Sequence, residues 1–185
     1  TNLKDPKGLN EHLLAGLEPK GVPKGLRGSI LPFRYNRIDE LEQLVKHTKG
    51  KLAAIIMEPI HGEEPKAGFL KKVRKIADKS GAVLIFDEIS IGFKETIGGS
   101  HLLYKVTPDI AVFSKGMSNG YPMAAIIGKK EVMQAAQDTF ISSTYWTESI
   151  GPAAALATIK KMQKFNVPKH LIKIGEAANE GLERL

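Results

Sequence analysis

The sequence predicts an α/β domain built around a mostly parallel sheet, with one antiparallel strand and helices on both faces. Apolar runs of strand length occur at 53–57, 82–87 and 109–114, and helical or glycine-bearing segments separate them. Alternation of this kind is typical of parallel strands joined by right-handed crossovers. A further apolar run at 123–128 follows after a turn that is too short for a crossover, so this strand should pair antiparallel with its predecessor.

The N-terminal part of the chain, residues 1–34, is rich in Gly, Pro and Lys and is predicted to be loop-dominated. Residues 31–35 are expected to form a short strand, which Pro32 restricts to a sheet edge or a strand start. Asn36 is expected to cap a helix over 38–47, because an asparagine side chain accepts hydrogen bonds from the first free backbone N–H groups of a helix.

The later helices follow from the spacing of apolar residues and from the residues that end helices. A helix over 69–80 should close at Gly81, since glycine readily adopts the left-handed conformation found just after a helix. A short helix is expected at 131–138, and longer ones at 152–164 and 170–185.

A lysine and an acidic pair follow two of the predicted strands. Asp87 and Glu88 end one strand, and Lys115 follows the next. Parallel strands deliver such residues to the crevice where open α/β sheets bind ligands. Taken alone, Lys115 could point at solvent, and Asp87 could cap the next segment or bind a metal. Together they match the needs of pyridoxal phosphate, which takes a Schiff-base lysine and an aspartate beside its protonated ring nitrogen.

Several spaced motifs resemble those of one enzyme family. They are Glu58-Pro59-Ile60 with Gly62-Glu63, the stretch 87–93, Gly98-Gly99, Thr107-Pro108-Asp109 and the stretch 113–116. In this order they resemble the core of a class III aminotransferase, and the resemblance runs from about Pro19 to the C-terminus. The segment 114–125 is similar to the glutamate-1-semialdehyde aminomutase and aminotransferase branch of that class.

The resemblance implies roles for individual residues. Lys115 would form the internal aldimine with pyridoxal 5′-phosphate and shuttle protons between the substrate carbon and the cofactor. Asp87 would pair with the pyridinium nitrogen, and Ile89 would press on one face of the ring. Glu58 would lie on the wall of the active site as a substrate or pocket residue. Thr147 would bind the cofactor phosphate across a dimer interface.

The segment around Thr147 departs from the family pattern. Ile150 and Gly151 stand where the family has a Gly-Asn pair. Ser143 and Thr144 offer neighbouring hydroxyl groups that could serve the same phosphate.

The resemblance also implies the organisation of the chain and its reaction. The chain would be a fragment of the large domain of a fold-type I pyridoxal-phosphate transferase, working as a homodimer on a small amino or keto substrate. Residues 35–168 would form part of the cofactor-binding core, after the loop-rich segment 1–34, and the helix 169–185 would lead to a missing C-terminal domain. The reaction would be amino-group transfer, by transamination or by intramolecular 2,1-amino transfer. The alternative is an inactive or non-catalytic fragment that folds or oligomerises without cofactor.

Composition argues against several other classes of function. The 185 residues include no Cys, so a disulfide framework or thiolate metal site is impossible, and a cytoplasmic location is expected. The histidines lack companions at metal-ligand spacing, so no metal is expected. No apolar run approaches the roughly 20 residues of a membrane span. The net charge of +7 comes mostly from dispersed lysines, so neither nucleic acid nor membrane is an expected partner.

Overall fold

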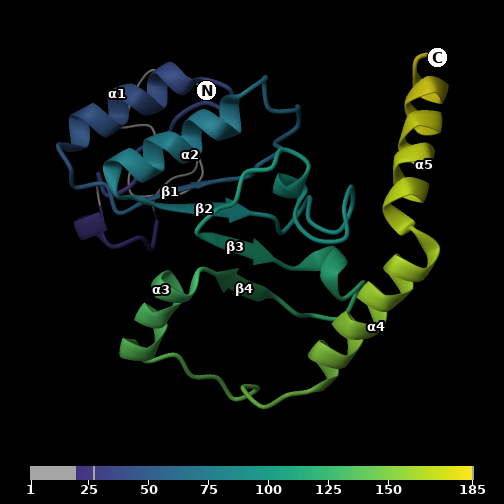
Figure 1. Ribbon diagram of the computed structural model, residues 1–185. Coiled ribbons are helices and arrows are strands. Elements are labelled where there is room, and N and C mark those ends of the chain that lie inside the picture. The colour runs from purple at the N-terminus through teal and green to yellow at the C-terminus, as the bar shows by residue number, and fades with distance from the viewer. Residues whose placement is uncertain (1–19, 27, 185) are drawn as a thin grey trace.

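The computed structural model describes residues 20–26 and 28–184, which form an α/β domain around one four-stranded sheet (Figure 1). The strands are β1 (Ala54–Met57), β2 (Val83–Asp87), β3 (Ile110–Phe113) and β4 (Ala125–Gly128), and they lie in that order across the sheet. β1, β2 and β3 are parallel, whereas β3 and β4 are antiparallel. The predicted mixed sheet, including its antiparallel strand, is confirmed.

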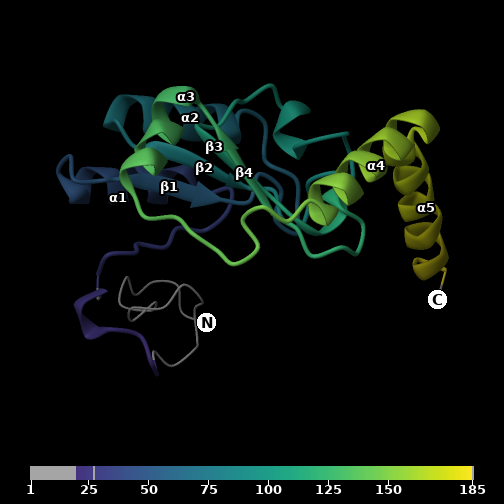
Figure 2. The same cartoon turned by 90° about the horizontal axis from the view of Figure 1, so that it is seen from below.

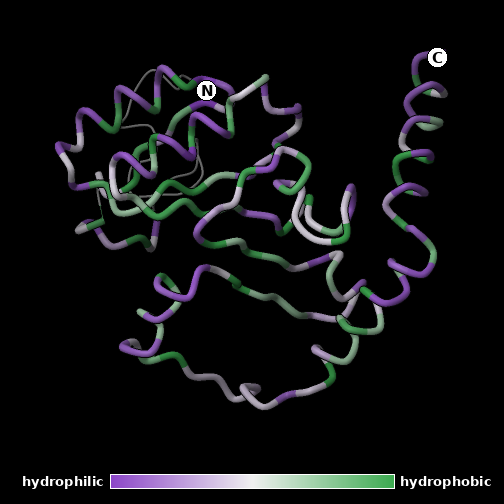
Figure 3. Tube along the Cα trace, viewed as in Figure 1, coloured by the Kyte–Doolittle hydropathy of each residue, from purple (hydrophilic) through white to green (hydrophobic). Residues whose placement is uncertain are grey.

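Two helices cover one face of β1 and β2. They are α1 (Ile38–Thr48) and α2 (Phe69–Ser80). Both lie on the same side of these strands (Figure 1), and their apolar residues alternate with polar ones along the tube of Figure 3. α2 ends as predicted at Gly81, whose φ of 72° lets its N–H reach the carbonyls of Ala77 and Asp78.

The main core lies between these helices and the sheet. Side chains alternate along each strand, so every second residue points toward the helices. On this covered face Leu84 and Phe86 are completely buried, and they join Ile55, Leu70 and Val73 in one cluster. Burial of this apolar surface is the main force that holds the strand register.

The opposite face of the sheet is more accessible, and we call it the open face. The strand register places Ile56, Ile85, Val112 and Ile126 on it. Ile56 and Ile126 are 61% and 60% exposed. Helices are predicted on both faces of the sheet. Among the described residues the open face is the less covered of the two, because much of its apolar surface remains accessible.

The C-terminal half adds helices beyond β4. They are α3 (Lys130–Met133), α4 (Ile150–Phe165) and α5 (Val167–Leu182). The described residues also form the 3-10 helices η2 (Lys24–Leu26), η3 (Ser100–Leu102), η4 (Lys115–Met117) and η5 (Gln134–Asp138), the last directly after α3. α4 and α5 lie to one side of the sheet in two perpendicular views (Figure 1, Figure 2). Ala155 of α4 packs with Phe93, Phe113 and Met117 in a second core cluster. α4 is thereby attached to the end of β3.

Two local expectations near the start of the domain are wrong. Residues 31–34 have no regular secondary structure, because Pro32 offers no N–H for pairing and Phe33 packs against the main core instead. Asn36 does not cap α1, whose N-cap is Arg37 without a side-chain hydrogen bond. The Asn36 side chain instead donates to the carbonyl of Glu64 and accepts from the N–H of Lys66. Asn36 therefore holds the loop that precedes α2.

The predicted N-terminal segment 1–34 lies partly outside the described residues, since 1–19 and 27 are not among them. Its described remainder contains η2 and no strand. Among the described helices, none is long and apolar enough to cross a membrane.

Candidate active site

The carboxyl ends of the three parallel strands meet at one edge of the sheet. Glu58 follows β1, Asp87 is the last residue of β2, and Lys115 lies two residues after β3. Three of the predicted site residues are thus delivered to the same edge by neighbouring strands. In open α/β sheets this edge is where ligands bind.

Lys115 lies where the backbone leaves β3 and enters η4. Its φ of 45° is left-handed, an uncommon conformation for a residue with a side chain. Ser114 helps to fix this turn, because its hydroxyl donates to the carbonyl of Met123 at 2.7 Å. Lys115 itself is exposed, and its Nζ donates to the hydroxyl oxygen of Ser90 at 2.7 Å.

Asp87 and Ile89 belong to the turn that follows β2. Asp87 is half-buried, and its Oδ1 accepts a hydrogen bond from the backbone N–H of Ile89 at 2.9 Å. This is the capping role that the sequence left open for Asp87. The bond uses one carboxylate oxygen only, so it is compatible with a second partner for the charge.

Ser90 links the turn after β2 to Lys115. It lies three positions after Asp87 and contacts Lys115, which is 25 residues away in the sequence. The contact shows that the turn after β2 and the lysine after β3 lie together. Sequence reasoning missed Ser90, since nothing in its local pattern distinguishes it from an ordinary turn serine.

Glu88 anchors the loop that follows this turn. Its side chain is completely buried, and its carboxylate accepts hydrogen bonds from the backbone N–H and hydroxyl of Ser100 and from the backbone N–H and Nδ1 of His101, at 2.7–3.0 Å. Burial raises the pKa of this carboxyl, but the bonds from His101 and Ser100 outweigh it, so the net pKa lies below its usual value. The buried, charged side chain of Glu88 therefore fixes the loop at residues 100–101 to the position directly after Asp87.

Glu58 lies beside other polar side chains, those of His61 and Tyr35, near the same edge of the sheet. Its Oε1 lies 3.2 Å from Nδ1 of His61, and the hydroxyl of Tyr35 donates to the carbonyl of Pro59 at 2.5 Å. Burial raises the pKa of Tyr35 above its ordinary value, with a smaller contribution from Tyr104 and nearby glutamates. Glu58 is thus placed at the sheet edge with His61 as its partner.

Thr147 is exposed in the segment that precedes α4. Its neighbour Glu148 links this segment to Tyr121, which lies before β4. The Glu148 carboxylate accepts hydrogen bonds from the N–H groups of Ile150 and Gly151 at the start of α4, and its Oε1 lies 3.3 Å from the Tyr121 hydroxyl. Burial and the nearby Glu148 charge raise the pKa of Tyr121.

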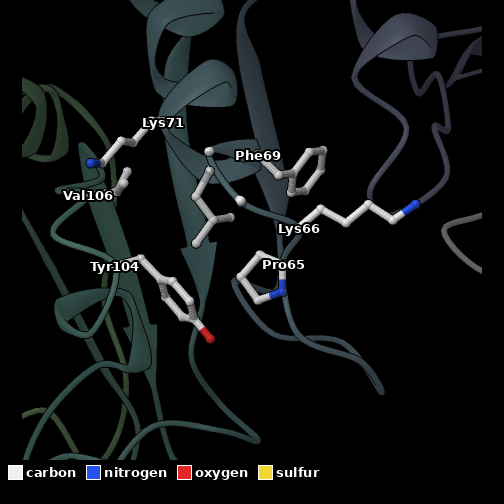
Figure 4. Close-up of a pocket in the computed structure, with 9 residues that line it drawn as sticks. Pro65, Lys66, Phe69, Lys71, Tyr104 and Val106 are labelled. Carbon is white, nitrogen blue, oxygen red and sulfur yellow. The ribbon is translucent and has the colours of Figure 1, made fainter.

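A pocket of about 240 Å³ lies at the N-terminal end of α2 (Figure 4). It is lined by Pro65, Lys66, Ala67, Gly68, Phe69, Leu70, Lys71, Tyr104 and Val106, none of which is a predicted site residue. The described parts of the chain contain no group of three or more His, Asp or Glu residues that could hold a metal ion.

The fold and this lysine-aspartate edge define an α/β domain of the kind that builds pyridoxal phosphate sites. Residues 33–185 match the family model described as aminotransferase class-III. The chain belongs to this family. The resemblance inferred from the motifs is therefore confirmed.

Relatives named for different activities are similar to this chain. A 3-aminobutyryl-CoA aminotransferase of Cloacimonas acidaminovorans is 42% identical over 151 residues, covering 78% of this chain and 36% of the relative. A glutamate-1-semialdehyde 2,1-aminomutase of Ignicoccus hospitalis is 33% identical over 171 residues, covering 89% of this chain and 40% of the relative. The relatives thus include both an aminotransferase, at 42% identity, and an aminomutase, at 33% identity.

Solved structures agree with the fold. The FumI protein of Sphingopyxis sp. MTA144, in its PLP internal aldimine form, matches with a TM-score of 0.83 and 28% identity over 89% of this chain and 41% of that one. The chain spans about two fifths of the length of the relatives that it matches.

Proposed function

We propose that this chain supplies the lysine-bearing part of the active site of an enzyme that transfers amino groups with pyridoxal 5′-phosphate. The observation that carries the proposal is the 2.7 Å contact between Nζ of Lys115 and Ser90, because it unites the lysine with the turn that begins at Asp87. Membership of the aminotransferase family supports the same conclusion.

The described residues fit this cofactor. Its aldehyde needs an accessible primary amine, and Lys115 is exposed at the strand edge. Its ring nitrogen needs a carboxylate to stay protonated, and Asp87 lies at the end of the neighbouring strand. When bound, the cofactor supplies an electron sink for the substrate carbon.

Each residue then has a defined task. The Lys115 amine would hold the cofactor and would move a proton at the substrate carbon. Asp87 keeps the ring nitrogen protonated, and Ile89, two residues beyond, limits the position of the ring. Glu58 contributes to the wall on which a small amino or keto substrate would lie.

Because the relatives include an aminotransferase and an aminomutase, the proposal is amino-group transfer without a choice between them.

We further propose that the enzyme is a homodimer in which Thr147 binds the cofactor phosphate of the other subunit. The exposed aromatic residues beside Thr147 support this, since Phe140, Tyr145 and Trp146 are 96%, 77% and 67% exposed. Exposed aromatic clusters are typical of surfaces that contact a partner. A cytoplasmic location is part of the same proposal.

The proposal is tested by removing the amine in the full-length protein. Lys115→Ala should abolish turnover of an amino donor and keto acceptor, while the folded structure is retained because the side chain is exposed. Lys75→Ala is the matched control, since Lys75 is an exposed lysine of α2. Turnover by the Lys115→Ala protein at the rate of the control would overturn the proposal.

A further inference from the structure

Ser90 is the hydroxyl group that the structure places at the amine of Lys115. Two other serines lie in the same region, but each donates to a backbone carbonyl: Ser114 to Met123 and Ser118 to Tyr121. Ser90 differs from them because its Oγ is the acceptor for the Lys115 ammonium, at 2.7 Å.

The backbone around Ser90 is firmly held. Glu88, two residues before it, is completely buried and satisfied by donors from Ser100 and His101. The turn closes through the N–H of Gly92, which donates to the carbonyl of Glu88 at 2.8 Å. The Ser90 hydroxyl therefore projects from a fixed support, whereas Lys115 carries its amine on a long, flexible stem.

We propose that Ser90 is a positioning residue for Lys115, and this inference rests on the proposed function. Its hydroxyl holds the lysine amine whenever that amine is not bonded to the cofactor. A free lysine would sample many rotamers, and a proton transfer is efficient only when donor and acceptor are already placed.

A hydroxyl group suits this task because it can both accept and donate a hydrogen bond. It accepts from the ammonium form of Lys115 and can donate to the neutral amine. The same contact can thus persist while the lysine gains and loses its proton. Serine keeps this ability on a short side chain, which keeps the held amine close to the turn that begins at Asp87.

The test uses the full-length protein with Ser90→Ala and Ser90→Thr, and with Ser80→Ala as a control at the end of α2. For Ser90→Ala we expect kcat to fall about tenfold with KM changed less than about twofold, the pattern of an interaction needed for the chemical step rather than for binding. Ser90→Thr retains the hydroxyl and should restore most of kcat. Ser80→Ala should match the parent, because the Ser80 hydroxyl donates to the carbonyl of Ala77 within its own helix.

A second measurement does not depend on turnover. In cofactor-free protein, the rate at which acetic anhydride modifies Lys115, relative to exposed Lys75, is followed by peptide mass spectrometry. Loss of the Ser90 hydroxyl should raise this ratio about two- to tenfold, the change in population that one ordinary hydrogen bond sustains. Ser90→Thr should keep the parent ratio.

The outcomes separate the two proposals. Parent-like kcat and labelling in Ser90→Ala, with Lys115→Ala inactive, would overturn the role of Ser90 alone. An equal loss of kcat in Ser90→Thr and Ser90→Ala would do the same, since it would exclude the hydroxyl as the cause. Full turnover by Lys115→Ala would instead overturn the proposed function.

Discussion

Asp87 and Lys115 are brought together by neighbouring parallel strands, so their relation depends on the pairing of β2 with β3. Asp87 is paired with Val112, three residues before Lys115. A register slip of one residue would turn every side chain of the strand to the opposite face. The buried residues Phe86 and Ala111, paired next to them, hold this register.

Asp87→Asn tests the charge at the end of β2. The amide is almost the same size but cannot stabilise a protonated ring nitrogen, so turnover in the full-length protein should fall about 100-fold while the cofactor stays bound. The visible absorbance of the protein after dialysis measures binding, and steady-state assays measure the rate. Asp78→Asn is the control, because Asp78 pairs with Arg74 at the other end of the sheet. Parent-like turnover of the Asp87→Asn protein would show that the ring nitrogen has another partner.

Glu88 predicts a pH dependence of stability. Its pKa is lowered in the folded protein from a reference of 4.5, so the carboxylate stabilises the fold above that reference, and this contribution is lost as pH falls through the lower folded pKa. Glu88→Gln should therefore lower the free energy of unfolding at pH 7 by about 2 kcal/mol, because a buried carboxylate with four donors is replaced by an amide.

The difference between Glu88→Gln and the parent should shrink as the pH is lowered below 4.5. Urea unfolding at several pH values measures it. Glu42→Gln, on the exposed side of α1, should follow the parent at every pH. A Glu88→Gln deficit that stays constant across this pH range would mean that the buried charge is not its cause.

At the scale of elements, local sequence signals predicted most of the fold. α2 was predicted with its observed limits because apolar spacing and a terminal glycine agree. The antiparallel β4 followed from the short turn before it. Two of the failures have non-local causes: Asn36 bonds to a loop about 30 residues away, and Ser90 meets a lysine 25 residues away.

Local sequence signals likewise indicated part of the candidate site. Asp87 and Lys115 could be recognised because each follows an apolar strand. Glu88 was recognised only as part of an acidic pair, since its donors come from a separate loop. The role of Thr147 stays a prediction, because a residue expected to act on another subunit cannot be tested within one chain.

Gly92→Ala tests the packing of the loop after β2. A Cβ at this position would lie 2.6 Å from the carbonyl oxygen of Glu88 and 2.9 Å from the ring of Phe113, so the variant should be destabilised by about 1–3 kcal/mol. Gly175→Ala is the control and should stabilise the protein, because a Cβ there meets nothing within 4 Å and alanine favours the helix. Thermal unfolding compares the two, and equal midpoints would contradict the tight packing at Gly92.

At the scale of the whole molecule, apolar surface of the described residues remains accessible in several places. Two of them are the open face of the sheet, with Ile56 and Ile126, and the segment before α4, with Phe140 and Trp146. Contiguous apolar surface of this kind usually contacts another part of the protein or a partner. The proposed homodimer would use the second of these surfaces.

The central claim is that Lys115 carries the cofactor, and covalent trapping tests it most directly. The full-length protein is incubated with pyridoxal 5′-phosphate, reduced with borohydride, digested and mapped by mass spectrometry. The reduced cofactor should be found on the peptide that contains Lys115, and the Lys115→Ala protein should yield no equivalent product. Stoichiometric label on any other lysine would contradict the account.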